Sequence, residues 1–177
     1  METIYIETER LILRSWKNED RAFFAEMNRN EHVMKYFPKL LSTEESDSFV
    51  NRIIAEFEKF GYGLYAVETK DTGDFIGYVG FHRFNFEAPF SPNWEIGWRI
   101  SDRFWHKGYA TEAAQACIKY AQENKLFDRL FSFTAIQNIP SENVMKRIGM
   151  THICSFMHPA LPDEHLLKQH QLYSIKL

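Results

Sequence analysis

Residues 94–114, WEIGWRISDRFWHKGYATEAA, pass from the period of a strand to the period of a helix across one glycine-containing loop. A period of two predicts a strand with one closely packed face and one face of different character. The large apolar residues of the first face are Trp94, Ile96, Trp98 and Ile100, and the residues expected on the opposite face are Glu95, Gly97 and Arg99.

The second part of this stretch predicts an amphipathic helix that begins near Gly108 or Tyr109. Small and apolar residues recur there with the helical period, at Ala110, Ala113, Ala114, Cys117, Ile118 and Ala121. The first N–H groups of a helix have no partner within it, and its macrodipole places about half a positive charge at that end. Backbone groups alone can therefore hold a phosphate or pyrophosphate there. In the alternative interpretation, Gly108 is only a tight turn between two packed elements.

The composition indicates one globular domain over residues 1–177. Hydrophobic residues make up 45% of the chain and include 16 Phe, enough for a sizeable core. No segment reaches the ~18 apolar residues of a membrane span, and the charged start METIYIETER argues against an export signal. Two cysteines provide no disulfide framework, which fits a reducing compartment. We therefore expect a cytoplasmic protein that does not bind a membrane. A net charge of −3 also argues against binding to nucleic acid.

Periodicity and capping residues predict the rest of the fold. Ser42 and Glu45 form a capping box before the second helix, Asn18 or Asp20 is expected to cap the first, and Asn138 is expected to cap the last. The predicted strands cover residues 10–15, 62–70, 75–84, 94–100, 129–135, 150–156 and 171–177, and the predicted helices cover about 18–27, 42–60, 108 onward and 138–149.

The loop before the central helix, W-H-K-G-Y-A-T-E-A, resembles motif A of the GNAT superfamily of N-acetyltransferases. That superfamily's pyrophosphate loop has the form Q/R-x-x-G-x-G/A, and Trp105, Gly108 and Ala110 stand at its three defined positions. Trp at the first position is usual in the RimJ/RimL-like branch, named for enzymes that acetylate the N-termini of ribosomal proteins. His106 stands where that branch usually has Gly. Histidine tolerates a positive φ better than most residues.

A second motif strengthens this resemblance. Residues 138–150, NIPSENVMKRIGM, resemble the N-x-x-S-x-N/R-V segment and the following G-F of the same branch, with Met150 in place of Phe. The opening T-E-R-L-x-L-R and the I-G-x-x-G-F of residues 76–81 are also usual there. The resemblance covers essentially the whole chain. It implies the GNAT fold, an α/β fold with a mixed central sheet, helices on both faces and the element order βααβββαβαββ.

The resemblance also implies acetyl-CoA as the cosubstrate, bound between the strands of residues 94–100 and 129–135. Strand backbone groups would bind the pantetheine, the loop and the helix start would bind the pyrophosphate, and two asparagines would bind the far side of the cofactor. The cofactor-binding residues expected on this basis are Trp98, Arg99, Ile100, His106, Lys107, Gly108, Tyr109, Ala110, Thr111, Asn138 and Asn143.

Two residues are candidates for the chemistry of N-acetylation. An amine with a pKa near ~10 must lose a proton before it attacks a thioester, and Glu95 is the candidate base because it lies on the strand that should hold the acetyl group. Alternatively, Glu95 is solvated or paired with Arg99. Met145 occupies the position at which many GNAT enzymes have a Tyr acid, so Ser141 is the remaining proton donor; a Ser at a helix start can also simply bond a free N–H. An N–H near Ile100 could polarise the thioester.

Three irregular stretches, residues 33–41, 84–94 and 156–169, are expected to form the acceptor pocket. The aromatic residues Phe84, Phe86 and Phe90 could line it or could pack under their own loop, and Glu87, Asp163 and Glu164 could attract a cationic amine. We expect no metal, because His158, His165 and His170 match no zinc-binding spacing.

The sequence therefore predicts an acetyl-CoA-dependent N-acetyltransferase that acts on a primary amine, either a small molecule or a protein N-terminus, and that is a monomer or homodimer. The alternative is a non-catalytic GNAT-fold module that binds acyl-CoA as a sensor or partner-binding domain. Turnover of an amine separates the two hypotheses.

Overall fold

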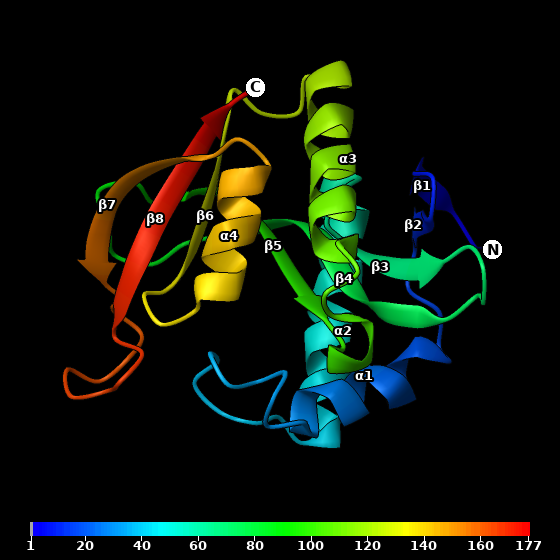
Figure 1. Cartoon of the computed structure of the whole chain (residues 1–177), viewed down its shortest axis with the longest axis horizontal. Coiled ribbons are helices and arrows are strands. Elements are labelled where there is room, and N and C mark those ends of the chain that lie inside the picture. The colour runs from blue at the N-terminus through cyan, green and yellow to red at the C-terminus, as the bar shows by residue number, and fades with distance from the viewer. Residues whose placement is uncertain (1) are drawn as a thin grey trace.

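A computed structural model describes residues 2–177 as an eight-stranded sheet with the strand order β1-β2-β3-β4-β5-β6-β8-β7 (Figure 1). The β5–β6 pair is parallel and all other pairs are antiparallel, so the sheet is mixed. The elements are β1 Ile4–Glu7, β2 Leu11–Arg14, α1 Asp20–Arg29, α2 Thr43–Phe60, β3 Leu64–Thr69, β4 Phe75–Phe84, β5 Asn93–Ile100, the 3-10 turn Asp102–Phe104, α3 Tyr109–Glu123, β6 Arg129–Ala135, α4 Ile139–Arg147, β7 Thr151–Met157 and β8 Gln169–Lys176.

The predicted elements are all present, and the structure adds one strand that the sequence did not reveal. Strand β1 has only four residues and pairs with β2 at the edge of the sheet. The capping box of Ser42 and Glu45 and the cap by Asn138 are confirmed. The predicted cap of α1 is wrong: Glu19 occupies the cap position without a side-chain bond, and the carboxylate of Asp20 binds Arg14 instead.

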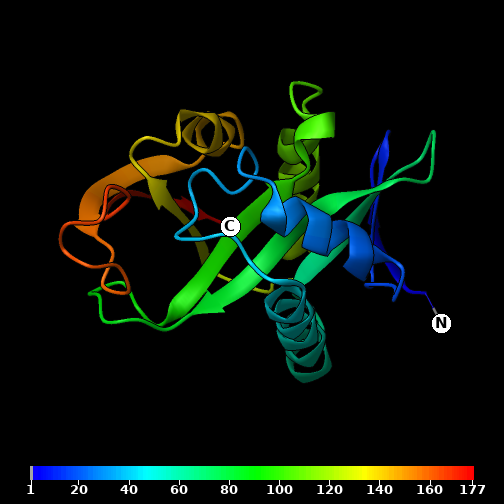
Figure 2. The ribbon, with the colours of Figure 1, turned by 90° about the horizontal axis from the view of Figure 1, so that it is seen from below.

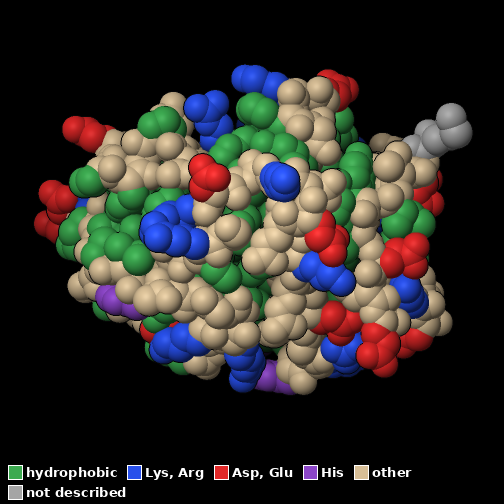
Figure 3. Space-filling view, turned by 90° about the horizontal axis from the view of Figure 1, so that it is seen from above, with side chains coloured by type: hydrophobic (Ala, Val, Ile, Leu, Met, Phe, Trp, Pro, Cys, Tyr) green, Lys and Arg blue, Asp and Glu red, His purple; other side chains and the backbone are tan. Residues whose placement is uncertain are grey.

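Helices cover both faces of the sheet, with α2 and α3 on opposite sides in Figure 2. One apolar cluster joins α3 and α4 to the sheet through residues such as Cys117 and Met145, and it includes Ile96 and Ile100 of β5. A second cluster joins α1 and α2 to the other face. Basic and acidic side chains are interspersed on the face shown in Figure 3, in keeping with the small net charge.

Strand β5 separates from β6 almost as soon as the two meet. It pairs with β4 from Asn93 to Ile100, but with β6 only where Glu95 lies opposite Phe131. The N–H of Ser101 donates to β4, and peptide groups alternate in direction along a strand. The backbone groups of Trp98 and Ile100 therefore point into the opening between β5 and β6, where no strand meets them.

Gly77 allows β4 to lie close to β5. Its φ is +138°, and a Cβ atom at this position would be 2.1 Å from the carbonyl oxygen of Arg99. Only glycine fits such a close backbone contact at this φ. Gly77 thus allows β5 to be held in place beside β4.

A buried arginine connects β2, α1 and β3. Arg14 is 1% exposed, and its guanidinium donates two hydrogen bonds to Asp20, at 2.8 and 2.9 Å, and one to Glu68, at 2.8 Å. The Oδ2 atom of Asp20, which accepts one of these bonds, also accepts the N–H of Lys17, at 2.7 Å. Asp20 therefore fixes the start of α1 against the sheet.

We predict that Asp20→Ala lowers the free energy of unfolding by about 3 kcal/mol, because it leaves a buried guanidinium short of a partner. Urea denaturation followed by circular dichroism measures this change. The matched control is Asp47→Ala, which removes a partly exposed ion pair with Arg21 and should cost less than about 1 kcal/mol. Equal effects of the two substitutions would contradict the assigned role of Asp20.

Candidate active site

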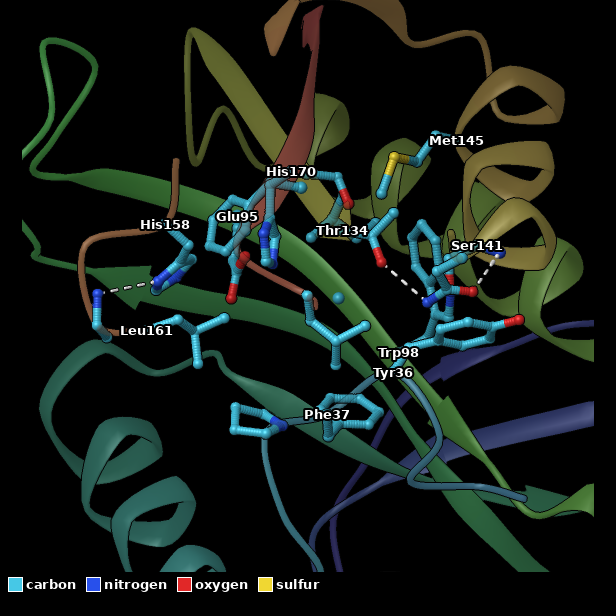
Figure 4. Close-up of a pocket in the computed structure, with 18 of the residues that line it drawn as sticks. Tyr36, Phe37, Glu95, Trp98, Thr134, Ser141, Met145, His158, Leu161 and His170 are labelled. Carbon is cyan, nitrogen blue, oxygen red and sulfur yellow. Dashed lines mark hydrogen bonds between the residues drawn. The ribbon is translucent and has the colours of Figure 1, made fainter. Parts of the chain in front are cut away.

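A cavity of about 320 Å³ passes through the sheet where β5 and β6 separate (Figure 4). Its walls come from both faces: Glu95 and Tyr78 lie on the side of α1 and α2, whereas Trp98, Ser141 and Met145 lie on the side of α3 and α4. The remaining lining residues are Tyr36, Phe37, Pro38, Ile96, Gly97, Ser132, Phe133, Thr134, Asn138, His158, Ala160, Leu161, Leu167 and His170.

A larger groove of about 580 Å³ adjoins this cavity and runs to the start of α3. The cavity and the groove share five lining residues, Tyr36, Phe37, Trp98, Asn138 and Ser141. The other predicted cofactor residues in the groove lining are Arg99, Ile100, His106, Gly108, Tyr109, Ala110, Thr111 and Asn143. The structure therefore brings together every predicted cofactor residue except Lys107, which contributes to the loop through its backbone.

Glu95 is the one acidic residue of the described chain that lines the cavity. Burial raises its pKa to about 7, with nearby His82 opposing this shift and Glu56 adding to it. His82 lies directly across the β4–β5 ladder from Glu95, and its Nδ1 is 3.0 Å from the carboxylate of Glu56. A carboxylate with this pKa is divided between its two protonation states at neutral pH, which suits proton transfer.

Arg99 is not the partner of Glu95. Its guanidinium donates to the side-chain oxygen of Asn28 and lies over the ring of Phe37, 4.0 Å from the ring centre. Arg99 is buried, and its Nε has no hydrogen-bond partner within residues 2–177. Its side chain supports the loop between α1 and α2 and lines the groove, while its backbone groups face β4 rather than the opening.

Ser141 is held with its hydroxyl at the junction of the cavity and the groove. The indole N–H of Trp98 donates to its Oγ at 3.3 Å, and Asn138, whose Nδ2 donates to Thr134, caps α4 by accepting the Ser141 N–H. Since Asn138 performs the capping, the Ser141 hydroxyl keeps its own proton free to donate. This role of the Trp98 indole could not be predicted from the sequence, because the two residues are far apart in the chain.

The loop before α3 has the left-handed conformation at two positions, with φ of 61° at His106 and 80° at Gly108. His106 therefore keeps the backbone direction that a glycine would give. Gly108 is followed directly by Tyr109, the first residue of α3, so the free N–H groups of the helix start face the groove. These groups form a suitable site for a pyrophosphate.

Hydrogen bonds from the N-terminal segment hold this loop in place. Arg10 donates to the carbonyl oxygen of Lys107 at 3.0 Å and to Glu112 of α3 at 2.7 Å. Glu112 also accepts from the hydroxyl of Thr8 at 2.6 Å, and the Arg10 guanidinium lies 4.7 Å from the ring centre of Tyr109. Although desolvation raises the pKa of Glu112, these hydrogen bonds hold it below its usual value. The T-E-R opening thus supports the loop structurally.

Trp105 binds one backbone carbonyl of β5 that would otherwise be free to bind a ligand in the groove. Its indole N–H donates to the carbonyl oxygen of Ile100 at 2.8 Å. The Ile100 N–H and both backbone groups of Trp98 still point into the opening between β5 and β6. Trp105 therefore connects the loop to the end of β5.

Two of the three predicted acceptor stretches line the cavity. The first stretch contributes Tyr36, Phe37 and Pro38 to the lining, and the last contributes His158, Ala160, Leu161 and Leu167. The stretch of residues 84–94 does not line it. Its aromatic residues Phe84, Phe86 and Phe90 pack under their own loop against Phe131, Phe133 and Phe156, because this packing removes much of their apolar surface from water. Glu87, Asp163 and Glu164 are exposed and lie outside the lining, so they do not contact a ligand within the cavity.

His158 and His170 lie in the cavity wall with ring centres 4.9 Å apart and ring planes tilted by 49°, rather than converging with carboxylates. Residues 2–177 contain no group of three or more His, Cys, Asp or Glu side chains placed to hold a metal ion. Within the same residues, no helix is both long and apolar enough to cross a membrane.

Comparison with known proteins places this geometry in a family. Residues 10–151 match the model of the acetyltransferase (GNAT) domain. The chain is 35% identical over 149 residues to the uncharacterized N-acetyltransferase YnaD of Bacillus subtilis, covering 83% of this chain and 82% of YnaD.

Solved structures agree with this match. An acetyltransferase of the GNAT family from Bacillus anthracis superposes with a TM-score of 0.81 and 29% identity, covering 98% of each chain. The fold is also that of RimL, the ribosomal L7/L12 alpha-N-protein acetyltransferase solved with coenzyme A, with a TM-score of 0.80 and 16% identity over 99% of this chain and 98% of that one. The chain therefore belongs to the GNAT family of N-acetyltransferases, enzymes that use acetyl-CoA as the acetyl donor.

Proposed function

We propose that this protein transfers the acetyl group of acetyl-CoA directly to a primary amine, with Glu95 as general base and Ser141 as proton donor. The observation that carries the proposal is the passage between β5 and β6. It connects the cavity that contains the Glu95 carboxylate with the groove that leads to the start of α3. An amine on one face of the sheet can therefore reach a thioester that enters from the other face.

The groove suits a long, anionic cofactor. The N–H groups from His106 to Thr111 would bind the pyrophosphate at the N-terminus of α3. The C=O group of Trp98 and the N–H of Ile100 would hydrogen-bond the amides of the pantetheine, as an added strand would. Asn138 and Asn143 would bind the opposite side.

The chemistry then divides among three groups of the protein. The Glu95 carboxylate takes a proton from the ammonium, and the freed nitrogen forms a bond to the thioester carbonyl carbon. The N–H of Trp98, the free β5 N–H nearer Glu95, stabilises the oxyanion that forms. The carbon–sulfur bond breaks, the Ser141 hydroxyl supplies a proton to the departing sulfur, and the second proton that the nitrogen loses restores this hydroxyl. A thiolate whose conjugate acid has a pKa of about 8.5 needs little of this help.

A non-catalytic acyl-CoA-binding module is the competing function. The observation in its favour is Met145, which is buried beside Ser141 in the cavity wall and cannot donate a proton. The raised pKa of Glu95 favours catalysis, because a binding module has no need of a half-ionised carboxylate at the passage.

The Glu95 assignment predicts a pH profile. Since the base acts when ionised, kcat/KM should fall as the pH drops through about 7, the pKa of Glu95. Glu95→Gln should lower kcat/KM by about 100-fold and remove this acidic limb, while the affinity for acetyl-CoA stays unchanged. Release of CoA, followed with a thiol reagent, measures the rates. Full activity of Glu95→Gln with the same pH profile would rule out the base role.

The Ser141 assignment predicts a smaller effect. Ser141→Ala should lower kcat by about tenfold with little change in KM for acetyl-CoA, because the thiolate leaves readily. Trp98→Phe removes the indole N–H that holds the hydroxyl and should lower kcat in the same direction. If both variants keep the kcat of the unchanged protein, Ser141 donates no proton in the slow step.

A further inference from the structure

We infer that the acceptor is a compact primary amine whose ammonium is its only charge and whose body is apolar. This inference rests on the proposed function and names the substrate class of the same site. Phenethylamine and hexylamine are examples of the class.

The charges in the cavity wall limit the charge that the acceptor can carry. Glu95 is the single acidic residue in the lining formed by residues 2–177, and no Lys or Arg contributes to that lining. A carboxylate on the acceptor would lose its water without gaining a cationic partner, and a second ammonium would lose its water without a second carboxylate. The wall therefore matches one positive charge, at the end that contains Glu95.

The two histidines do not add positive charge. The Nδ1 of His158 accepts the N–H of Ala160 at 3.3 Å, whereas the Nδ1 of His170 lies 3.3 Å from the carbonyl oxygen of Lys168 and must donate to it. The first contact leaves the His158 ring a single proton, on Nε2, and the second places a proton on Nδ1 of His170. Burial and the nearby Lys168 lower the pKa of His158, and burial and His158 lower the pKa of His170 to about 4. Both rings are therefore neutral at pH 7 and do not repel an ammonium.

Lys168 is close to the cavity, but its ammonium group is bound by other residues of its own loop. Its ammonium group binds the carbonyl oxygen of Leu161 and pairs with Asp163 at 3.2 Å, and its side chain is not part of the lining. These bonds close the loop of residues 158–168 on itself. The wall that this loop forms is thus held in place before any ligand binds.

Apolar side chains complete the cavity opposite Glu95. Tyr36 and Phe37 enter from the loop between α1 and α2, and Leu161 and Leu167 enter from the loop between β7 and β8 (Figure 4). The Arg99 guanidinium beneath the Phe37 ring fixes the first of these loops. A small apolar body gains from contact with such walls, whereas a polar peptide gains much less.

Matched amine pairs test the inference. Phenylalanine differs from phenethylamine by one carboxylate, and hexamethylenediamine differs from hexylamine by one ammonium. In each pair kcat/KM should be at least about tenfold higher for the monoamine, the cost of an unpartnered charge. A preference for phenylalanine, for the diamine or for a short peptide with a free N-terminus would overturn the inference and leave the acetyltransferase proposal standing.

A binding measurement distinguishes a wrong substrate class from a failure of the proposed catalysis. Calorimetric titration of the CoA-saturated protein with the same four amines requires no turnover. Tighter binding of both monoamines supports the inference even if no acetyl group is transferred, an outcome that would overturn only the proposed catalysis. Equal or weaker binding of the monoamines overturns the inference.

Two neighbouring leucines provide a matched pair of variants. Leu167 lines the cavity, whereas Leu166 is 86% exposed and lies outside it. Leu167→Asp introduces a second carboxylate and should shift the preference toward hexamethylenediamine over hexylamine by about tenfold, while Leu166→Asp should change it less than about twofold. Equal shifts in the two variants, or no shift in Leu167→Asp, would show that this cavity does not select the acceptor.

Discussion

The single bridge between β5 and β6 is the constraint on which the site depends. Because the two strands pair only at Glu95 and Phe131, the sheet opens beyond this point and exposes the peptide groups of Trp98 and Ile100. The same opening joins the cavity containing Glu95 to the groove that ends at α3. A fully paired sheet would separate the base from the thioester. The catalytic proposal therefore follows from where hydrogen bonding between strands stops.

Contacts between distant segments hold this opening in place. Gly77 permits the close approach of β4 that positions β5 from one side. Arg10 and Glu112 fix the loop before α3, and the Trp105 indole ties that loop to the end of β5. Groups that would bind the cofactor are thus arranged before it arrives, which reduces the entropy lost on binding.

Local sequence predicted the elements well, because the periods of residues 94–100 and of α3 are strong and the caps at Ser42 and Asn138 are local. It also placed Glu95 on the correct strand face. It did not predict β1, whose four residues at the sheet edge carry a weak pattern, and it left open whether Phe86 and Phe90 line the cavity or pack under their own loop. The Trp98–Ser141 bond depends on tertiary contact, which a period cannot reveal.

Acetyl-CoA binding tests the central claim most directly. Calorimetric titration should give a dissociation constant in the micromolar range, about −8 kcal/mol, for acetyl-CoA. Acetylpantetheine, which lacks the pyrophosphate, should bind at least about tenfold more weakly, because the N–H groups at the start of α3 then have no anion. No binding of acetyl-CoA, or equal affinity for the two compounds, would contradict the assignment of the groove and of the loop from His106 to Thr111.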